Sequence, residues 1–210
     1  MGLALVVLDA RPGCTGPEGP PSVKVFSREP QVTWGPSPRR YQHFCGAIGI
    51  FDRRIFLELG GFDDIYLPFF VEETDLCYRA WKRGYRVLYD PRPWLVHHHR
   101  ESGTILRKFA WSVRKVQYRK NRLLFLWKNL THPAYVALHV VYLVFQLCFS
   151  WMAGHGVFYR GFAEAVKLWR EVLARRREEV PKFVRSDRQV FGEFARELVR
   201  ARRYLDTSLA

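Results

Sequence analysis

The chain has 210 residues, of which 48% are hydrophobic, a composition typical of a globular protein with a real core. Its four cysteines are widely spaced and form no CxxC pair, which argues against a zinc-binding module. The formal net charge of +14 is uneven, because residues 1–104 carry 13 Lys/Arg against 12 Asp/Glu and residues 105–210 carry 21 against 8. The second half therefore predicts contact with a polyanion, either nucleic acid or an anionic membrane surface.

The amino-terminal apolar run at residues 3–8 follows no basic segment, so it predicts a buried strand and not a signal peptide. Residues 11–40 are rich in proline and glycine and predict a loop. Cys45, Cys77 and Cys148 lie in apolar surroundings, which indicates reduced core thiols and fits a cytosolic location.

The rest of the first half alternates short strands with helices, which predicts an α/β layer. Asp52 is a suitable N-cap for a short helix that Gly60 and Gly61 end. A second helix is expected from near Glu72 to Gly84. Its apolar face is expected to carry Leu76, Cys77, Ala80 and Trp81. The expected strands are residues 3–8, 43–51, 85–91 and 94–99.

The second half is expected to be helical. Residues 105–129 predict a basic amphipathic helix, and residues 129–159 contain no Asp, Glu, Lys or Arg. The apolar helix expected over about 133–158 is long enough to cross or re-enter a bilayer, and it also fits the membrane interface or a buried position. The helix expected over about 162–179 has the form of one that lies on an anionic surface. A last amphipathic helix is expected over 187–205.

Three carboxylates, Glu72, Glu73 and Asp75, stand at the expected start of the second helix. One interpretation is that they solvate a surface and are stabilised by the helix dipole. The other follows from crowding, because neighbouring like charges and aromatic side chains both raise the pKa of a carboxyl group. Such a carboxylate can take a proton from a hydroxyl group while its oxygen attacks an electrophilic carbon.

Residues 43–128 resemble the C-terminal half of the catalytic domain of family 2 glycosyltransferases, of the bacterial rhamnosyltransferase-like kind. That family typically shows GA, RR and GGFDE segments, an E-D-x-D-L-C-x-R helix start, G-Y-x-V-x-Y-x-P, and V-x-H-H followed by Ser. The matching segments are Gly46-Ala47, Arg53-Arg54, Gly60 to Asp64, Glu72 to Arg79, Gly84 to Pro91, and Val96 to Ser102. The resemblance depends on several motifs in the family's order and spacing.

The resemblance implies a GT-A fold and inverting transfer of a sugar from a nucleotide sugar to an acceptor hydroxyl. In the family, the second acidic residue of the E-D pair is the base, and that position is Glu73 here. Glutamate is one methylene longer than aspartate, so its carboxylate would reach slightly further. Glu72 and Asp75 would position the helix start and tune Glu73.

The resemblance also implies acceptor-binding and metal-binding positions. Gly46, Asp63 and Asp64 would lie near the acceptor, although the two aspartates also fit simple turn chemistry. His97 or His98 would bind a divalent cation, Mg²⁺ or Mn²⁺, on the donor diphosphate. The histidines also fit polar residues at a strand end. Because a strand points them to opposite faces, the choice between them stays open.

Two regions follow from these patterns. Residues 1–104 are expected to be the C-terminal half of a GT-A domain without its donor-binding half and DxD motif, so the chain is expected to be truncated. Residues 105–210 are expected to be a helical membrane-associated tail. The expected fold class is α/β, with a partial GT-A (Rossmann-like) sheet and flanking helices, followed by an α-helical basic and apolar region. An unpaired sheet edge would allow association.

The function expected first is a membrane-associated glycosyltransferase of cell-surface polysaccharide or glycolipid assembly, at the cytoplasmic face of the cell membrane. Its partners would be a nucleotide sugar, a lipid- or glycan-linked acceptor and an anionic membrane surface. The alternative is a non-catalytic membrane-associated remnant or partner subunit of such an enzyme. A nucleic-acid binder is the third hypothesis, and the long uncharged apolar run argues against it.

Overall fold

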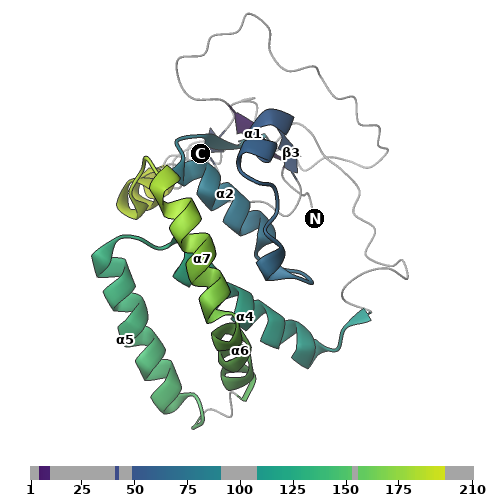
Figure 1. Ribbon diagram of the computed structural model, residues 1–210, viewed down its shortest axis with the longest axis vertical. Coiled ribbons are helices and arrows are strands. Elements are labelled where there is room, and N and C mark those ends of the chain that lie inside the picture. The colour runs from purple at the N-terminus through teal and green to yellow at the C-terminus, as the bar shows by residue number, and fades with distance from the viewer. Residues whose placement is uncertain (1–4, 10–40, 43–48, 91–107, 153–155, 197–210) are drawn as a thin grey trace, which may run out of the picture.

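The computed structural model describes residues 5–9, 41–42, 49–90, 108–152 and 156–196 (Figure 1). Most of these residues are helical. The helical segments in chain order are α1 (Arg53–Glu58), η1 (Asp64–Tyr66), α2 (Glu72–Lys82), α4 (Trp111–Asn129), α5 (Pro133–Phe149), α6 (Gly156–Lys167), α7 (Trp169–Glu179), η2 (Val180–Lys182) and a helix over 187–196.

The β-structure of the described residues is small. It consists of β1 (Leu5–Asp9), β2 (Tyr41–Gln42), β3 (Gly49–Phe51) and β4 (Arg86–Asp90) in the order β2-β4-β1-β3. β1 pairs with β3 in parallel, whereas β4 is antiparallel to both β1 and β2.

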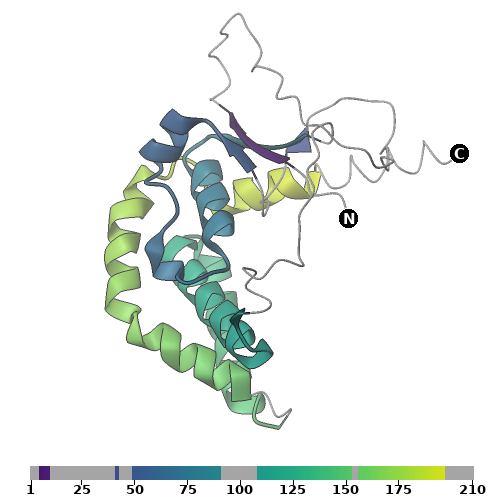
Figure 2. The same cartoon turned by 90° about the vertical axis from the view of Figure 1, so that its right-hand side faces the viewer.

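The expected α/β class, with a partial GT-A (Rossmann-like) sheet and flanking helices, is therefore wrong. A Rossmann-like sheet is mostly parallel and has helices on both faces. Here the central strand β1 runs antiparallel to β4, and the described strands have only two to five residues. The long helices that follow residue 108 form most of the described structure, and they extend away from the sheet (Figure 2).

Local capping signals in the first half predict its helices correctly. The Asp52 carboxylate accepts hydrogen bonds from the backbone N–H groups of Arg54 (2.8 Å) and Ile55 (3.2 Å), as an N-cap does. Gly60, with φ 79°, adopts the left-handed conformation that ends this helix. The expected buried face of α2 is also confirmed, because Leu76, Cys77, Ala80 and Trp81 are all at most 1% exposed.

The core has two parts. The first lies around α2, where its buried face packs with α1, β4 and the helix over 187–196. The second lies around α4, where Leu123 and Leu124 pack against Tyr66, Ala165 of α6 and Val172 of α7. α4 therefore connects the part that carries the carboxylate cluster to the C-terminal helices.

The helix over 187–196 is fixed to this core by Asp187, and Figure 2 shows that helix in yellow beneath the sheet. The Asp187 carboxylate accepts hydrogen bonds from the Tyr78 hydroxyl and from Lys82 Nζ, both at 2.5 Å. It also accepts from the backbone N–H groups of Thr131 (2.7 Å) and His132 (2.6 Å), just before α5. One carboxylate thus joins α2, the start of α5 and the last described helix.

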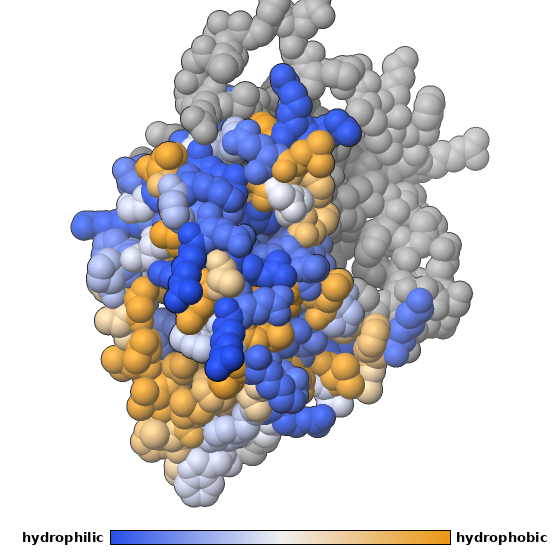
Figure 3. Space-filling view, viewed as in Figure 1, coloured by the Kyte–Doolittle hydropathy of each residue, from blue (hydrophilic) through white to orange (hydrophobic). Residues whose placement is uncertain are grey.

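α5 is apolar on all sides, yet none of its residues is fully buried. It contacts the body along a narrow stripe, where Trp127 Nε1 donates a hydrogen bond to His139 Nε2 (3.1 Å) and Tyr135 packs on Phe191. The exposed large apolar side chains of α5 are Val136, Leu138, Val140, Val141, Tyr142, Val144, Phe145 and Phe149. Hydrophobic surface gathers over this helix at the lower left of Figure 3.

α5 ends at Phe149 and α6 begins at Gly156, so two helices occupy the stretch where one apolar helix over about 133–158 was expected. Among the helices that the structure describes, none combines the length and the hydropathy needed to cross a membrane.

α4 and α6 cross closely at Gly161. A Cβ atom at this position would lie 2.7 Å from Arg119 Cβ and 3.1 Å from the backbone oxygen of Val116. Such distances are too short for carbon atoms in contact, so glycine is required for the helices to approach this far.

We predict that Gly161→Ala lowers the free energy of unfolding by about 1–3 kcal/mol, because the added methyl group forces α6 away from α4. Gly192→Ala is the matched control, since it also lies in a helix but a Cβ there meets no atom within 4 Å. Its better helix propensity should raise stability by up to about 1 kcal/mol. Chemical denaturation measures both, and equal effects would contradict the close packing.

Candidate functional site

A strained loop leads into the carboxylate cluster. Phe70 (φ 75°) and Val71 (φ 80°) both have left-handed backbone conformations, which residues other than glycine rarely adopt. For a β-branched valine this conformation is especially costly. Val71 is the N-cap residue of α2, so the strain is located directly before Glu72 and Glu73. Strain of this kind persists only where surrounding contacts hold it, and it often marks a functional site.

α4 provides those contacts. Asn121 Nδ2 donates to the backbone oxygens of Tyr66 (2.6 Å), Phe69 (2.9 Å) and Phe70 (2.8 Å), and Asn121 is fully buried. Gln117 Nε2 donates to the backbone oxygen of Leu67 (2.7 Å), one turn earlier on the helix. The carbonyl groups of the loop are thereby satisfied by amide side chains, and the loop is held in one conformation.

Glu72 and Glu73 form the first turn of α2 and are both half-buried. Burial raises the pKa of Glu73, and the neighbouring charge of Glu72 raises it further, although the backbone N–H of Glu73 opposes the shift. Oε2 of Glu72 is buried and has no hydrogen-bond partner in the part of the chain that the structure describes. The pair therefore has the desolvation and crowding that the sequence predicts for a base.

Asp75 has a different environment, because it is fully buried and surrounded by donors. Its carboxylate accepts from Arg79 Nε (2.6 Å), from Lys128 Nζ (2.9 Å), from the Tyr66 hydroxyl (2.8 Å) and from Asn129 Nδ2 (2.7 Å). Burial alone would raise the pKa of Asp75, but the charges of Arg79 and Lys128 outweigh it and lower that pKa to about 2. Asp75 thus stays ionised and fixes α2 to α4 and η1.

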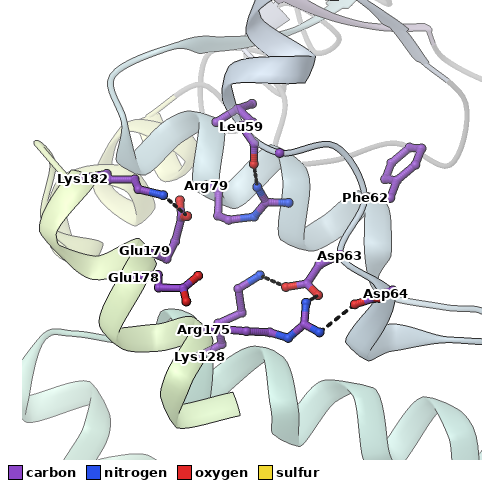
Figure 4. Close-up of a pocket in the computed structure, with 11 residues that line it drawn as sticks. Leu59, Phe62, Asp63, Asp64, Arg79, Lys128, Arg175, Glu178, Glu179 and Lys182 are labelled. Carbon is purple, nitrogen blue, oxygen red and sulfur yellow. Dashed lines mark hydrogen bonds and ion pairs between the residues drawn. The ribbon is translucent and has the colours of Figure 1, made fainter. Parts of the chain in front are cut away.

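Asp63 and Asp64 line a cavity of about 390 Å³ that also receives side chains from α7 (Figure 4). Asp63 pairs with Lys128 (2.5 Å) and with Arg175, and it caps η1 by accepting from the Ile65 N–H (3.1 Å). Asp64 is exposed and pairs with Arg175 (2.7 Å). The charged lining contains four cations and four carboxylates: Arg79, Lys128, Arg175, Lys182, Asp63, Asp64, Glu178 and Glu179.

The structure links two of the predicted site residues, Asp63 and Asp75, through Lys128, which pairs with both. Glu72 and Glu73 lie apart from this network. Within the described residues, neither of them lines the cavity of Figure 4 or the cavities near Gln189, Tyr118 and Leu143.

The remaining predicted positions cannot be placed. Gly46, His97 and His98 lie outside the described residues. Among the residues that are described, no group of three or more His, Cys, Asp or Glu side chains is arranged to hold a metal ion. The divalent cation thus stays a prediction from the family resemblance.

Sequence reasoning did not identify Lys128, Arg175 or Asn121 as parts of the site. Each lies 51 to 112 residues away in sequence from the site groups that it contacts, so no local pattern reveals the pairing. Asn121 gives one signal that could have been used. It is an uncharged polar residue next to Leu123 and Leu124 on a helix whose other polar residues are mostly basic.

Comparison with protein-family models, with curated proteins and with solved structures finds no match for this chain. The site is therefore interpreted from its own geometry.

We predict that Asp75→Asn lowers the free energy of unfolding by about 3–5 kcal/mol, because it leaves the buried cations Arg79 and Lys128 without their shared anion. The matched control is Asp64→Asn, which removes a carboxylate that is 72% exposed. Exposed ion pairs contribute about 0–1 kcal/mol, so this control should stay near wild type. Urea denaturation followed by circular dichroism measures both variants.

Proposed function

We propose that this chain serves in a membrane-surface glycosyltransferase, in which Glu73 takes the proton from an acceptor hydroxyl as that oxygen attacks the donor sugar. The observation that supports this most directly is the strained loop before α2, which holds Glu72 and Glu73 in a fixed and partly desolvated position. A general base needs both a fixed position and a pKa raised toward the working pH.

Glu73 is better suited to this role than the other acidic residues near it. Asp75 and Asp63 are held by cations, so neither has a lone pair free for an incoming proton without breaking an ion pair. Glu73 has no ion-pair partner among the described residues, and its raised pKa makes it the stronger base once it is ionised. Glu72 increases this basicity through its charge.

The membrane part of the proposal is supported by α5. This helix exposes a nearly continuous apolar surface, and it is followed by exposed Trp151 and Met152. An exposed apolar helix beside basic helices is typical of proteins that lie on an anionic bilayer surface. The cytoplasmic face of the cell membrane is the surface we propose, since its anionic lipids attract the charge of residues 105–210.

A non-catalytic partner or remnant of such an enzyme is the second candidate. It is favoured by one observation, namely that Glu73 lines none of the four cavities described above. Turnover separates the two candidates, because the non-catalytic chain binds the same membrane without transferring sugar.

We predict that Glu73→Gln abolishes transfer of sugar from nucleotide sugars to a membrane acceptor, measured with radiolabelled donors. The amide cannot accept the proton, and general-base catalysis typically contributes about 10²–10⁴-fold to a rate. The control is Glu164→Gln, an exposed residue paired with Lys167, which should keep full activity. If Glu73→Gln stays active while folding normally, Glu73 is not the base; if the wild type shows no transfer, the non-catalytic candidate stands.

The pH dependence follows from the direction of the Glu73 shift. Because burial raises the pKa of Glu73, the base loses its charge at a higher pH than an ordinary glutamate would. We predict that the transfer rate falls as the pH decreases through this raised pKa and levels off above it. A pH–rate profile whose acidic limb follows an unshifted or lowered pKa would contradict the role of burial.

We predict that Leu138→Gln weakens binding to anionic vesicles about tenfold, because it removes one apolar side chain from the exposed surface of α5. The matched control is Leu57→Gln on α1, since the two leucines are similarly exposed at 67% and 57%. Vesicle sedimentation measures both, and equal losses would contradict the assignment of α5 as the membrane-facing element.

A further inference from the structure

A second cavity, of about 540 Å³, lies between α4 and the first turn of α6. Four cations line it, namely Arg114, Lys115, Arg119 and Arg122. Their spacing of one, four and three residues places them on one side of α4, because a helix repeats every 3.6 residues. No carboxylate from the described part of the chain lines this cavity, and none forms an ion pair with these four side chains.

The cavity near Asp63 makes the contrast clear. It also has four cations in its lining, but four carboxylates accompany them and pair with most of them. The cavity beside α4 keeps its positive charge without such compensation. Four like charges held close together repel one another, so a bound anion would lower the energy of the site.

Aromatic rings hold the cations in place without neutralising them. Lys115 Nζ lies 4.5 Å from the centre of the Trp111 ring, and the Arg114 guanidinium lies 5.2 Å from the same ring. The Arg122 guanidinium lies 5.6 Å from the centre of the Tyr118 ring. Cation–π contacts of this kind orient a charged group and leave its N–H donors available for an anion. Nε of Arg114 is buried and has no hydrogen-bond partner within the described residues.

The other wall of the cavity is apolar. Phe70 contributes from the strained loop, and Val157 and Phe158 contribute from the first turn of α6. This wall continues toward exposed Trp151, because the Tyr159 hydroxyl donates to the Leu147 oxygen (2.8 Å) and accepts from the Trp151 N–H (3.1 Å). The end of α5 and the start of α6 are thus fixed side by side.

We propose that this cavity binds a lipid that ends in a phosphate group. The phosphate accepts hydrogen bonds from the cations of α4, since guanidinium groups match phosphate oxygens well. The first part of the lipid chain lies against Phe70 and Phe158 and leaves along the exposed apolar surface near Trp151. Binding at this site does not require sugar transfer, so the binding proposal can be tested independently of the role of Glu73.

A lipid fits this combination better than a nucleic acid does. The helix that carries these cations ends at Asn129, and residues 129–159 carry no charged side chain and expose many apolar ones. A polynucleotide would place further phosphates beside this surface, where residues 129–159 offer no cation to neutralise them. A lipid with one terminal phosphate puts its charge on α4 and its chain on the apolar wall.

The test measures calorimetric binding of the full chain to a short-chain phosphatidic acid kept below its micelle concentration. Short-chain phosphatidylcholine, inorganic phosphate and a single-stranded oligonucleotide serve as comparison ligands. We expect the phosphatidic acid to bind at least about tenfold more tightly than any of the three, because only it offers both a terminal phosphate and an acyl chain. Equal binding of inorganic phosphate, or tighter binding of the oligonucleotide, would overturn the proposal.

Two double variants locate the site. Arg114→Gln with Arg119→Gln should weaken binding of the phosphatidic acid about tenfold or more, because charge-assisted hydrogen bonds to the phosphate are lost. Arg170→Gln with Arg177→Gln removes the same charge from exposed positions on α7 and should change the affinity less than about twofold. Similar losses in both variants would show that only net charge matters, and would refute the site.

A single variant covers the case in which the first double variant does not fold. Lys115→Gln alters an exposed side chain of the same cavity and leaves the contact between Arg119 and Gly161 intact. It should weaken the binding of the phosphatidic acid severalfold at unchanged melting temperature. Unchanged affinity in this folded variant would count against the proposal.

Discussion

The buried carboxylate of Asp75 is the interaction on which the arrangement of the described elements depends. It receives donors from α2, from the neighbouring η1 and from the C-terminal end of α4, which is more than 50 residues away in sequence. A buried anion costs several kcal/mol of desolvation, which the fold recovers only while every donor is in place. The position of α4 is therefore coupled to that of α2.

This coupling explains how a strained loop can persist between η1 and α2. Lys128 and Asn129 fix the last turn of α4 to Asp75, while Asn121, two turns earlier, reaches the carbonyl groups of Phe69 and Phe70. Because α4 contacts Asp75 at one end and the loop two turns earlier, it holds the loop at a fixed position relative to α2. Glu72 and Glu73 follow this loop directly in the first turn of α2, so their position depends on α4.

The helices and their ends were predictable from the sequence because their signals are local. The Asp52 cap, the stop at Gly60 and the buried face of α2 all follow from patterns within a few residues. The class of the fold did not follow, because strand propensity does not reveal that β4 runs antiparallel to β1. The break between α5 and α6 has a local signal in "MAGHG" (152–156), which the long apolar run outweighed.

The site was predictable only in part, for the same reason. Crowded carboxylates beside aromatic residues indicate the raised pKa of Glu73, since its causes are burial first and then the neighbouring charge of Glu72. The same crowding does not reveal that Asp75 has the opposite shift, a lowered pKa. Burial alone would raise that pKa, and the charges of Arg79, one turn along α2, and of Lys128, 53 residues away, lower it; only the folded chain brings Lys128 to Asp75.

The hydrogen bonds and ion pair of Asp187 have a practical consequence for protein engineering. Lys82 Nζ is buried, and its counter-charge comes from the last described helix. A shortened chain that stops before residue 187 would leave the buried ammonium group of Lys82 without its counter-ion. The N–H groups of Thr131 and His132, just before α5, would also lose their acceptor. Affinity tags and fusion partners are therefore better joined after residue 196, because Asp187 and the helix that carries it are then retained.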